Sequence, residues 1–281
     1  MIHPAIAAVA RKDLQEVRQN RAAWMPIVIV PLIFVIILPL AMILIPTSMD
    51  ISPEALASDS DLDFFIGNMP ASMLREIEGM DEMQSIQVLM IGYLFAPFFL
   101  IFPLMFSTVI AAESFAGERE RKTLEALLYT PITNRQLFLG KVLAAYIPSV
   151  AITWLSFLVY TVVVNTAGYG IFHRLWFPLP TWYPLIFWIS PALGLLGISA
   201  TVLISTRVQT FMGAYQLSSS LVVLVLAFIF GQISGVVYLS VPVGLVTGLV
   251  LWLASAGLTY MAARSFTRRT LMMGKTRMRD L

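Results

Sequence analysis

Long apolar runs alternate with short polar segments along the chain, and none of these runs contains Asp, Glu, Lys, Arg or His. At a rise of about 1.5 Å per residue, each run can cross the roughly 30 Å hydrocarbon core of a bilayer. A helix satisfies its own backbone hydrogen bonds in lipid, and the alternating pattern of barrel strands is absent from the sequence. We therefore predict an all-α polytopic membrane protein with six transmembrane helices, at residues 22–46, 88–112, 142–166, 183–205, 209–231 and 241–263.

The composition supports this prediction. Of the 281 residues, 58% are hydrophobic and 12% are charged, and the mean hydropathy is +0.83. These values lie well outside the usage of ordinary soluble domains. The absence of cysteine excludes disulfides and thiol chemistry. The net charge of +2 follows from the membrane topology described next, so we expect no nucleic-acid partner.

The Lys and Arg residues are divided very unevenly between the two sides of the predicted bundle. Of the 18, only Arg75 and Arg174 fall on one side. The positive-inside rule therefore places both termini in the cytoplasm and the protein in the inner (cytoplasmic) membrane. The first apolar run lacks the small-residue cleavage site of a signal peptide, so we expect an uncleaved anchor.

The leader, residues 1–21, carries Ile6, Val9, Leu14 and Val17 at helical spacing. This pattern is typical of an amphipathic helix lying along the inner membrane surface. A simple basic leader that only sets the topology explains the sequence equally well, and the pattern does not choose between the two.

Two further polar segments complete the predicted layout. Residues 47–87 form an external acidic loop, in which a short helix is expected to follow Pro70 and to end near Gly79. Its string DSDLD does not fit a calcium-binding loop, because Phe64 and Pro70 stand where that motif needs Gly and Glu. Residues 264–281 form a basic cytoplasmic tail.

The predicted spans contain no group suited to catalysis or to proton coupling. An intramembrane enzyme needs a nucleophile with a base, paired acids or metal ligands, and a proton-driven carrier needs an ionisable side chain at membrane depth. Residues 274–276 of the tail read GKT, as at the end of a phosphate-binding loop motif, but Arg269 occupies the position of that motif's opening Gly. We therefore predict a non-enzymatic chain that binds no metal, ATP or other cofactor itself.

The second, fourth and fifth spans are the candidates for a substrate pathway, because interrupted or polar helices are tolerated where they line a cavity or pack on protein. Polar residues in the inner half of the fifth span are explained by packing between helices about twice as readily as by a substrate surface. The pathway residues that we predict are Pro97, Ser107, Tyr215, Gln216, Ser218 and Ser219.

The charged segment 113–141 is predicted to be a cytosolic helical hairpin. Leu124, Leu127 and Leu128 share one helical face, Pro131 ends that helix, and Thr133 begins the next with a capping box. A loop that packs back on the bundle needs no such spacing. An apolar ridge rimmed by charge instead favours a docking surface for a soluble partner.

The stretch ESFAGERERKTLEALLYTPITNRQLFLGK resembles the signature loop of the membrane subunits of ABC-type-2 exporters, and the resemblance extends over the whole chain. It is most like the sodium-exporter and multidrug-exporter permeases of that family. The family usually has Gly where Lys122 precedes the threonine here. The matching residues are Glu113, Glu118, Arg119, Glu120, Arg121, Thr123, Leu124, Glu125, Leu127, Leu128, Thr130 and Pro131.

The resemblance implies that this loop is a coupling element that inserts into a cleft of a separate cytosolic ATPase subunit, which uses ATP and Mg²⁺. It also implies two permease copies per transporter, as a homodimer or a heterodimer, in contact with membrane lipids. The leucines would fill the ATPase cleft, and Arg119, Arg121 and Glu125 would form ion pairs at its rim. Glu113 and Glu118 would transmit the tilt of the second span.

The hypothesis is thus the permease subunit of an ATP-driven exporter. The alternative is a membrane scaffold or sensor subunit that recruits an ATPase without transporting anything. The sequence leaves sodium, drugs, lipids and peptides open as substrates.

Overall fold

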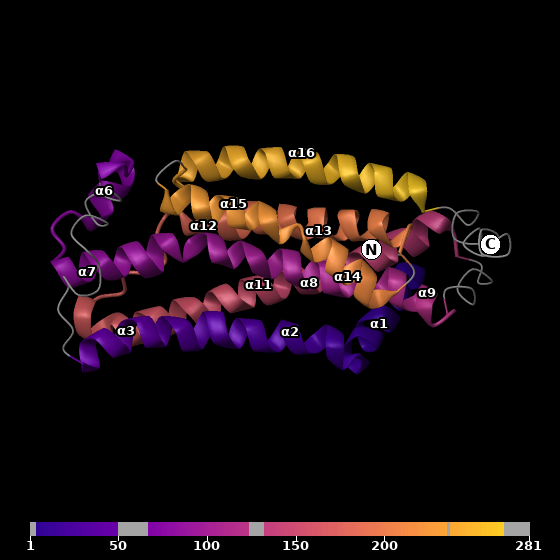
Figure 1. Ribbon diagram of the computed structural model, residues 1–281, viewed down its shortest axis with the longest axis horizontal. Coiled ribbons are helices and arrows are strands. Elements are labelled where there is room, and N and C mark those ends of the chain that lie inside the picture. The colour runs from indigo at the N-terminus through magenta and orange to yellow at the C-terminus, as the bar shows by residue number, and fades with distance from the viewer. Residues whose placement is uncertain (1–3, 50–66, 124–131, 209, 235–236, 267–281) are drawn as a thin grey trace.

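The computed structural model describes residues 4–49, 67–123, 132–208, 210–234 and 237–266. Within these ranges the secondary structure is entirely helical, and six helices are long and apolar enough to cross a membrane. This confirms the predicted all-α architecture. The six run roughly along one axis as a bundle (Figure 1), and they span Arg21–Ser48, Glu82–Glu120, Asn134–Phe172, Trp182–Ser205, Phe211–Ile233 and Val241–Ser265.

Several of these helices are built from more than one segment, because π-helical or 3₁₀ turns interrupt them. The first span comprises α2 (Arg21–Pro31), a π-helical segment (Leu32–Ile37) and α3 (Leu38–Ser48). The second comprises α7 (Glu82–Gln87), π-helical Val88–Leu94, 3₁₀ Ala96–Leu100, α8 (Ile101–Ala112), π-helical Glu113–Gly117 and α9 (Glu118–Glu120). The others are α11 (Asn134–Phe172), α12 (Trp182–Pro184) with π-helical Leu185–Ile189 and α13 (Ser190–Ser205), α14 (Phe211–Ser219) with α15 (Val222–Ile233), and α16 (Val241–Ser265).

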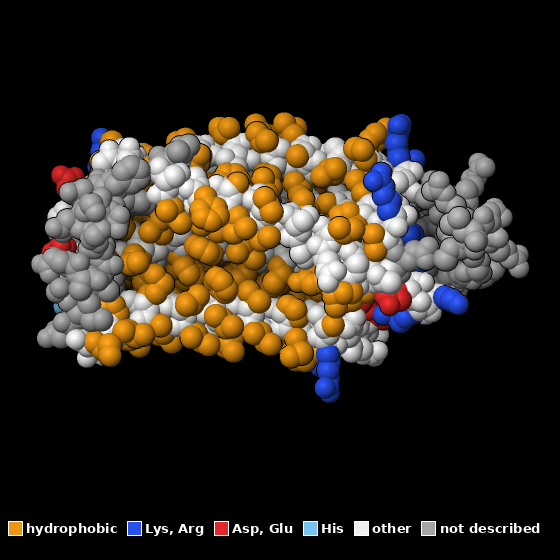
Figure 2. All heavy atoms as spheres, in the orientation of Figure 1, with side chains coloured by type: hydrophobic (Ala, Val, Ile, Leu, Met, Phe, Trp, Pro, Cys, Tyr) orange, Lys and Arg blue, Asp and Glu red, His pale blue; other side chains and the backbone are white. Residues whose placement is uncertain are grey.

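The second and fourth spans form the centre of the bundle. In their most apolar windows 72% and 78% of the residues are buried, against 17% in the first span and 22% in the fifth and sixth. The helix α13 packs against both α8 and α16, and α11 packs against α8 and α3. The outer helices present apolar side chains over a broad band between the two ends of the molecule (Figure 2). Such a band is what a lipid-facing surface requires.

The start of the second span is interrupted around Pro97, and donors from neighbouring helices satisfy the carbonyls that the interruption frees. Tyr160 Oη donates to Ile91 O at 3.0 Å, and Trp182 Nε1 donates to Gly92 O at 2.6 Å. Pro97 has no N–H for the carbonyl four residues earlier, and Gln232 Nε2 donates to that oxygen, on Tyr93, at 2.6 Å. The interruption is therefore packed inside protein.

The short helix expected in the acidic loop is confirmed as α6 (Ala71–Ile77), which follows Pro70, and Gly79 adopts the positive φ of +79° that favours glycine. The fifth span differs from the single helix expected, because the helix is interrupted by a turn between α14 and α15. There Ser219 and Ser220 donate to the carbonyls of Tyr215 and Leu217. Hydroxyls that bond to carbonyls of the preceding turn compete with the helical ladder.

The leader forms the helix α1 (Pro4–Gln19), which lies at the opposite end of the bundle from α6 (Figure 1). Its buried face, with Val9, Asp13 and Val17, packs against the first turns of α11. Gly140 of α11 permits this approach, since a Cβ there would lie 3.0 Å from Val9. Val9 and Val17 of the predicted apolar stripe therefore pack on protein, whereas Leu14 is exposed, and the placement of the leader at the membrane surface stays a prediction.

The closeness of α8 and α13 predicts an asymmetric response to adding one methyl group. A Cβ at Gly197 would overlap Ser107 Oγ and lie 3.2 Å from Leu104 and Thr108. We expect Gly197→Ala to lower the unfolding free energy by about 1–3 kcal/mol through overpacking, measured as a lower thermal midpoint in detergent. Gly257 of α16 has open space at the same position, so Gly257→Ala should be neutral or stabilising by up to about 1 kcal/mol. Equal midpoints for the two variants would contradict this packing.

Candidate functional site

A network of charged side chains joins α1 to the end of the second span and the start of the third. The second apolar run predicted a helix that ends at 112, but this helix continues to Glu120. The third helix begins at Asn134, ahead of the apolar run at 142, as the capping box at Thr133 predicted. The extensions carry Glu113 and Glu118 on one side and Lys141 on the other. The helix α1 contributes Lys12, Asp13 and Glu16.

Lys141 is the centre of the network and is fully buried. Its Nζ lies 2.7 Å from Glu118 Oε2 and 3.1 Å from Asp13 Oδ2, and it donates to Ser114 O at 2.7 Å. The side chains of Asp13 and Glu118 are also fully buried. A buried ammonium is stable only when it is paired and hydrogen-bonded, and this lysine meets both conditions.

A second layer of the network reaches the surface. Lys12 pairs with Glu16 at 2.9 Å and also contacts Glu118 Oε1. Arg121 Nη1 donates to Glu113 Oε1 at 2.6 Å, and its Nη2 lies 3.3 Å from Glu16 Oε2.

Between α1 and α2, Asn20 Nδ2 donates to Glu113 Oε2 at 2.7 Å. The start of α2, α1 and the start of α11 are thereby tied to the segment that precedes residue 124.

The network holds four carboxylates (Asp13, Glu16, Glu113 and Glu118) against three cations (Lys12, Arg121 and Lys141). Burial raises the pKa of the Asp13 carboxyl, and the nearby Lys141 only partly opposes this. A proton on Asp13 would leave the set electrically neutral, which is the cheapest state for a cluster removed from water.

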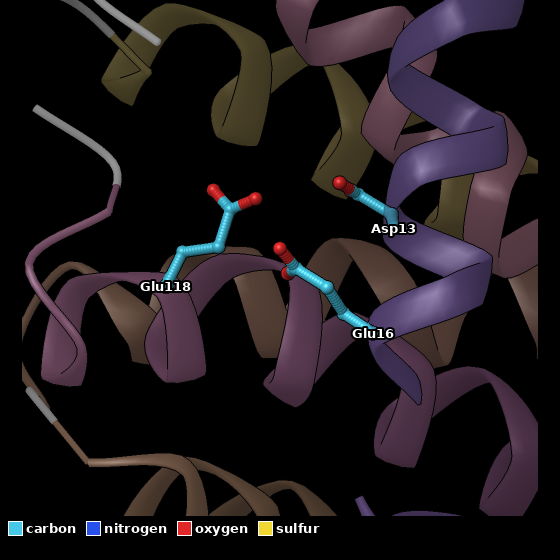
Figure 3. A group of neighbouring side chains, drawn as sticks. All are labelled: Asp13, Glu16 and Glu118. Atoms are coloured by element: carbon cyan, nitrogen blue, oxygen red, sulfur yellow. The ribbon is translucent and has the colours of Figure 1, made fainter. Parts of the chain in front are cut away.

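The carboxylates of Asp13, Glu16 and Glu118 point toward one another (Figure 3), and their oxygens lie within 4.8 Å of one another. Such a trio offers oxygen ligands for a cation. The ammonium groups of Lys12 and Lys141 already contact these oxygens and supply the compensating positive charge. A metal ion would have to displace both, so the arrangement is a salt-bridge network by its chemistry.

Because the pKa of Asp13 is raised in the folded protein, the unfolding free energy should fall as the pH rises. Between its ordinary pKa of about 3.9 and the raised value, the folded state binds more protons than the unfolded state, so stability falls as the pH rises through this window. Asp13→Asn cannot ionise and should lack this contribution. The measurement is the difference between the thermal midpoints of wild type and variant in detergent from pH 4 to 8. A difference that is constant, or that moves in favour of wild type as the pH rises, would contradict the assignment.

The other described members of the predicted coupling loop also have hydrogen-bond partners within the chain. Arg119 Nη1 donates to Ser205 O, and Glu120 Oε2 accepts from Phe211 N at 2.8 Å. Thr123 Oγ1 donates to Glu118 O at 3.2 Å. Leu124, Glu125, Leu127, Leu128, Thr130 and Pro131 lie outside the described residues.

The capping box predicted at the end of the hairpin is confirmed: Gln136 N donates to Thr133 Oγ1 at 3.3 Å, and Gln136 Oε1 accepts from Thr133 N at 3.0 Å. The third span thus begins where the sequence predicted a helix start.

The structure does not bring the predicted pathway residues together on one surface. Pro97, Ser107 and Ser218 are buried, Tyr215 and Ser219 are partly buried, and Gln216 is exposed. Ser107 donates to Leu104 O and packs against Gly197, as a helix-packing residue does. The assignment of all six to a pathway stays a prediction.

Sequence reasoning missed Asp13, Lys12 and Lys141 as members of the site. One signal was present: Asp13 lies four residues from both Val9 and Val17, which places a carboxylate in the middle of an apolar stripe. Such a carboxylate requires a buried partner. The sequence alone does not say that this partner is Lys141.

The helical bundle, with the salt-bridge network at one end, defines a multi-pass helical membrane protein. A family model described as ABC-2 family transporter protein matches residues 7–243. The match covers most of the chain, so this protein belongs to the ABC-2 transporter family and is a membrane permease of the ABC type. No curated protein and no solved structure matches the chain.

Proposed function

We propose that this permease is the membrane subunit of an ATP-driven exporter, powered by a separate cytosolic ATPase that docks on residues 113–141. One observation carries the proposal: the salt-bridge network ties α1, the end of the second span and the start of the third span together at the base of that segment. A partner that moves the segment would move α1 and the inner ends of the second and third spans as a unit, because buried ion pairs are costly to separate.

The end that carries α1 and α9 is, in this proposal, the cytoplasmic end. Lys and Arg side chains gather at that end of the visible face (Figure 2), and the positive-inside rule favours it. The protein would then lie in the cytoplasmic membrane. The ATPase would approach from the side on which ATP and Mg²⁺ are available.

The membrane assembly that we propose holds two permease copies, and a homodimer is the simplest form. The fifth span supports this, since its apolar residues are largely unburied within one chain while α15 contacts α8. A second copy or lipid can cover such a face.

The test uses proteoliposomes that contain the permease with its co-expressed ATPase. Radioactive sodium, a fluorescent amphiphilic dye and a fluorescent phospholipid serve as separate probes. We expect at least one probe to move from the ATPase side only when ATP and Mg²⁺ are present on that side. ATP hydrolysis without movement of any probe would favour the scaffold or sensor subunit instead.

A further inference from the structure

A groove lies on the outside of the bundle between the first turns of α11, the middle of α13 and the last turns of α16. Its volume is about 570 Å³, within the range of small-molecule sites, which run from roughly 300 to 1,000 Å³. The walls are almost entirely apolar. They include Phe138 and Leu139 of α11, Leu195 of α13, and Ala256, Tyr260 and Ala263 of α16.

The groove is separate from the salt-bridge network and from the predicted pathway residues. Its walls belong to spans three, four and six, while the network joins α1 to the second and third spans. Two of its lining side chains, Leu139 of α11 and Tyr260 of α16, are 47% and 58% exposed on the outside of these helices. A groove between such helices opens toward the acyl chains of the bilayer.

Positive charge stands at one end of this groove. Arg135, in the first turn of α11, lines it and is exposed. The guanidinium of Arg264 lies 4.6 Å from the ring centroid of Tyr260, which holds this second exposed arginine beside the groove. None of the lining residues is acidic.

The combination of an apolar trough with two arginines at its end matches the chemistry of one kind of molecule. A phospholipid with an anionic headgroup presents a negative phosphate at the membrane boundary and an acyl chain at the depth of the bilayer. Clusters of Lys and Arg beside the end of a transmembrane helix attract such lipids. A neutral lipid would use the walls but not the arginines, and a second protein chain would need a complementary acidic residue.

We propose that this groove is a binding site for an anionic glycerophospholipid, with one acyl chain between α11 and α16 and the headgroup between Arg135 and Arg264. The α11 wall of the groove lies within residues 113–141, so the proposal leaves the part of that segment before Thr133 to the ATPase; it does not depend on the substrate. It assigns a fixed lipid to the leaflet at the α1 end of the molecule.

The experiment is native mass spectrometry of the purified full chain in detergent, with equimolar phosphatidylglycerol and phosphatidylcholine added. Wild type should retain phosphatidylglycerol in preference to phosphatidylcholine. Each arginine near a membrane surface contributes about a fivefold preference for anionic lipid, so Arg135→Gln with Arg264→Gln should remove roughly a 25-fold preference. Ala263→Phe should fill the groove and reduce retention of both lipids.

Matched controls separate the groove from general charge and bulk. Arg18→Gln with Arg21→Gln removes two exposed arginines from the same end of the molecule, and Ala254→Phe adds the same bulk to an exposed position of α16 that does not line the groove. Both should retain lipid as wild type does. All variants are compared only where they elute from size exclusion as wild type does.

The proposal is overturned if wild type shows no preference between the lipids, or if the Arg135/Arg264 variant keeps the preference of its control. Because the chain has no native cysteine, Ala263→Cys provides a further check. A disulfide between two copies through this single cysteine in lipid vesicles would mean that a second chain covers the groove, and this would also overturn the proposal. Labelling of the cysteine by a lipid-soluble reagent, blocked by phosphatidylglycerol, is the expected result.

Discussion

Lys141→Met is expected to destabilise the folded protein by about 3–5 kcal/mol, the usual cost of removing one partner from a buried ion pair. Methionine matches the length of the lysine stem but removes the buried ammonium from Glu118 and Asp13, which then have only the partly exposed Lys12 as a cation nearby. Ser114 O would also lose its hydrogen bond from Nζ. The measurement is the thermal midpoint and the yield of monodisperse protein in detergent.

Two further variants distinguish loss of the ion pair from loss of packing. Lys141→Met with Glu118→Gln removes both charges and should recover part of the lost stability, because the carboxylate is no longer uncompensated. Lys122→Met changes an exposed lysine in the same region and should leave the unfolding free energy within about 0.5 kcal/mol of that of wild type. A Lys141→Met protein as stable as Lys122→Met would show that the buried pair contributes nothing.

Leu127→Asp is expected to abolish ATP-driven transport and co-purification of the ATPase, while the protein remains folded in the membrane. The proposal places this leucine in the ATPase cleft, where a carboxylate would be buried without a partner at a cost of several kcal/mol. The measurements are the yield of ATPase retained by the affinity-purified permease and probe movement in proteoliposomes. Wild-type yield of the ATPase would mean that docking lies elsewhere.

A matched control keeps this experiment specific. Leu175 is 77% exposed and lies between the third and fourth spans, on the side opposite the proposed ATPase. Leu175→Asp makes the same chemical change and should keep both ATPase and transport. Loss of transport in both variants would point to a general folding defect.

The sequence was sufficient to predict the architecture because membrane crossing imposes a simple physical requirement. A run of apolar residues that is long enough to span the bilayer must be helical. Helix start and stop signals located α6 after Pro70 and the capping box at Thr133, because these are local patterns of residues only a few positions apart.

The charged end of the bundle could not be predicted in this way. The rule that ends a span at the first charge stopped the second helix at residue 112 and so treated Glu113 and Glu118 as loop residues. Both are in fact buried in helical segments. The cost of burying Glu118 is offset by Lys12 of α1 and Lys141 of α11, and that of burying Glu113 by Asn20 and Arg121. Pairing between residues far apart in the chain leaves no periodic signal in the sequence.

The residues predicted to couple to an ATPase fall into two groups, those in the described helical segments and those after residue 123. The contacts of Arg119, Glu120 and Arg121 are intramolecular in the single chain. Whether any of these side chains also pairs with an ATPase depends on the partner's own surface, about which a single sequence carries no information. The three leucines belong to the part of the segment outside the described residues.

The separation of Lys141 from Asp13 has a consequence for how the protein is made. The two residues lie 128 positions apart, so a ribosome adding about 5–20 residues per second completes Lys141 on the order of ten seconds after Asp13. Throughout that interval Asp13 lacks the ammonium of Lys141, although its partner Ser114 on the second span has already been made. The salt-bridge network is complete only when the start of the third span has been made, and this makes it a late step of assembly that fixes α1 and two spans at once.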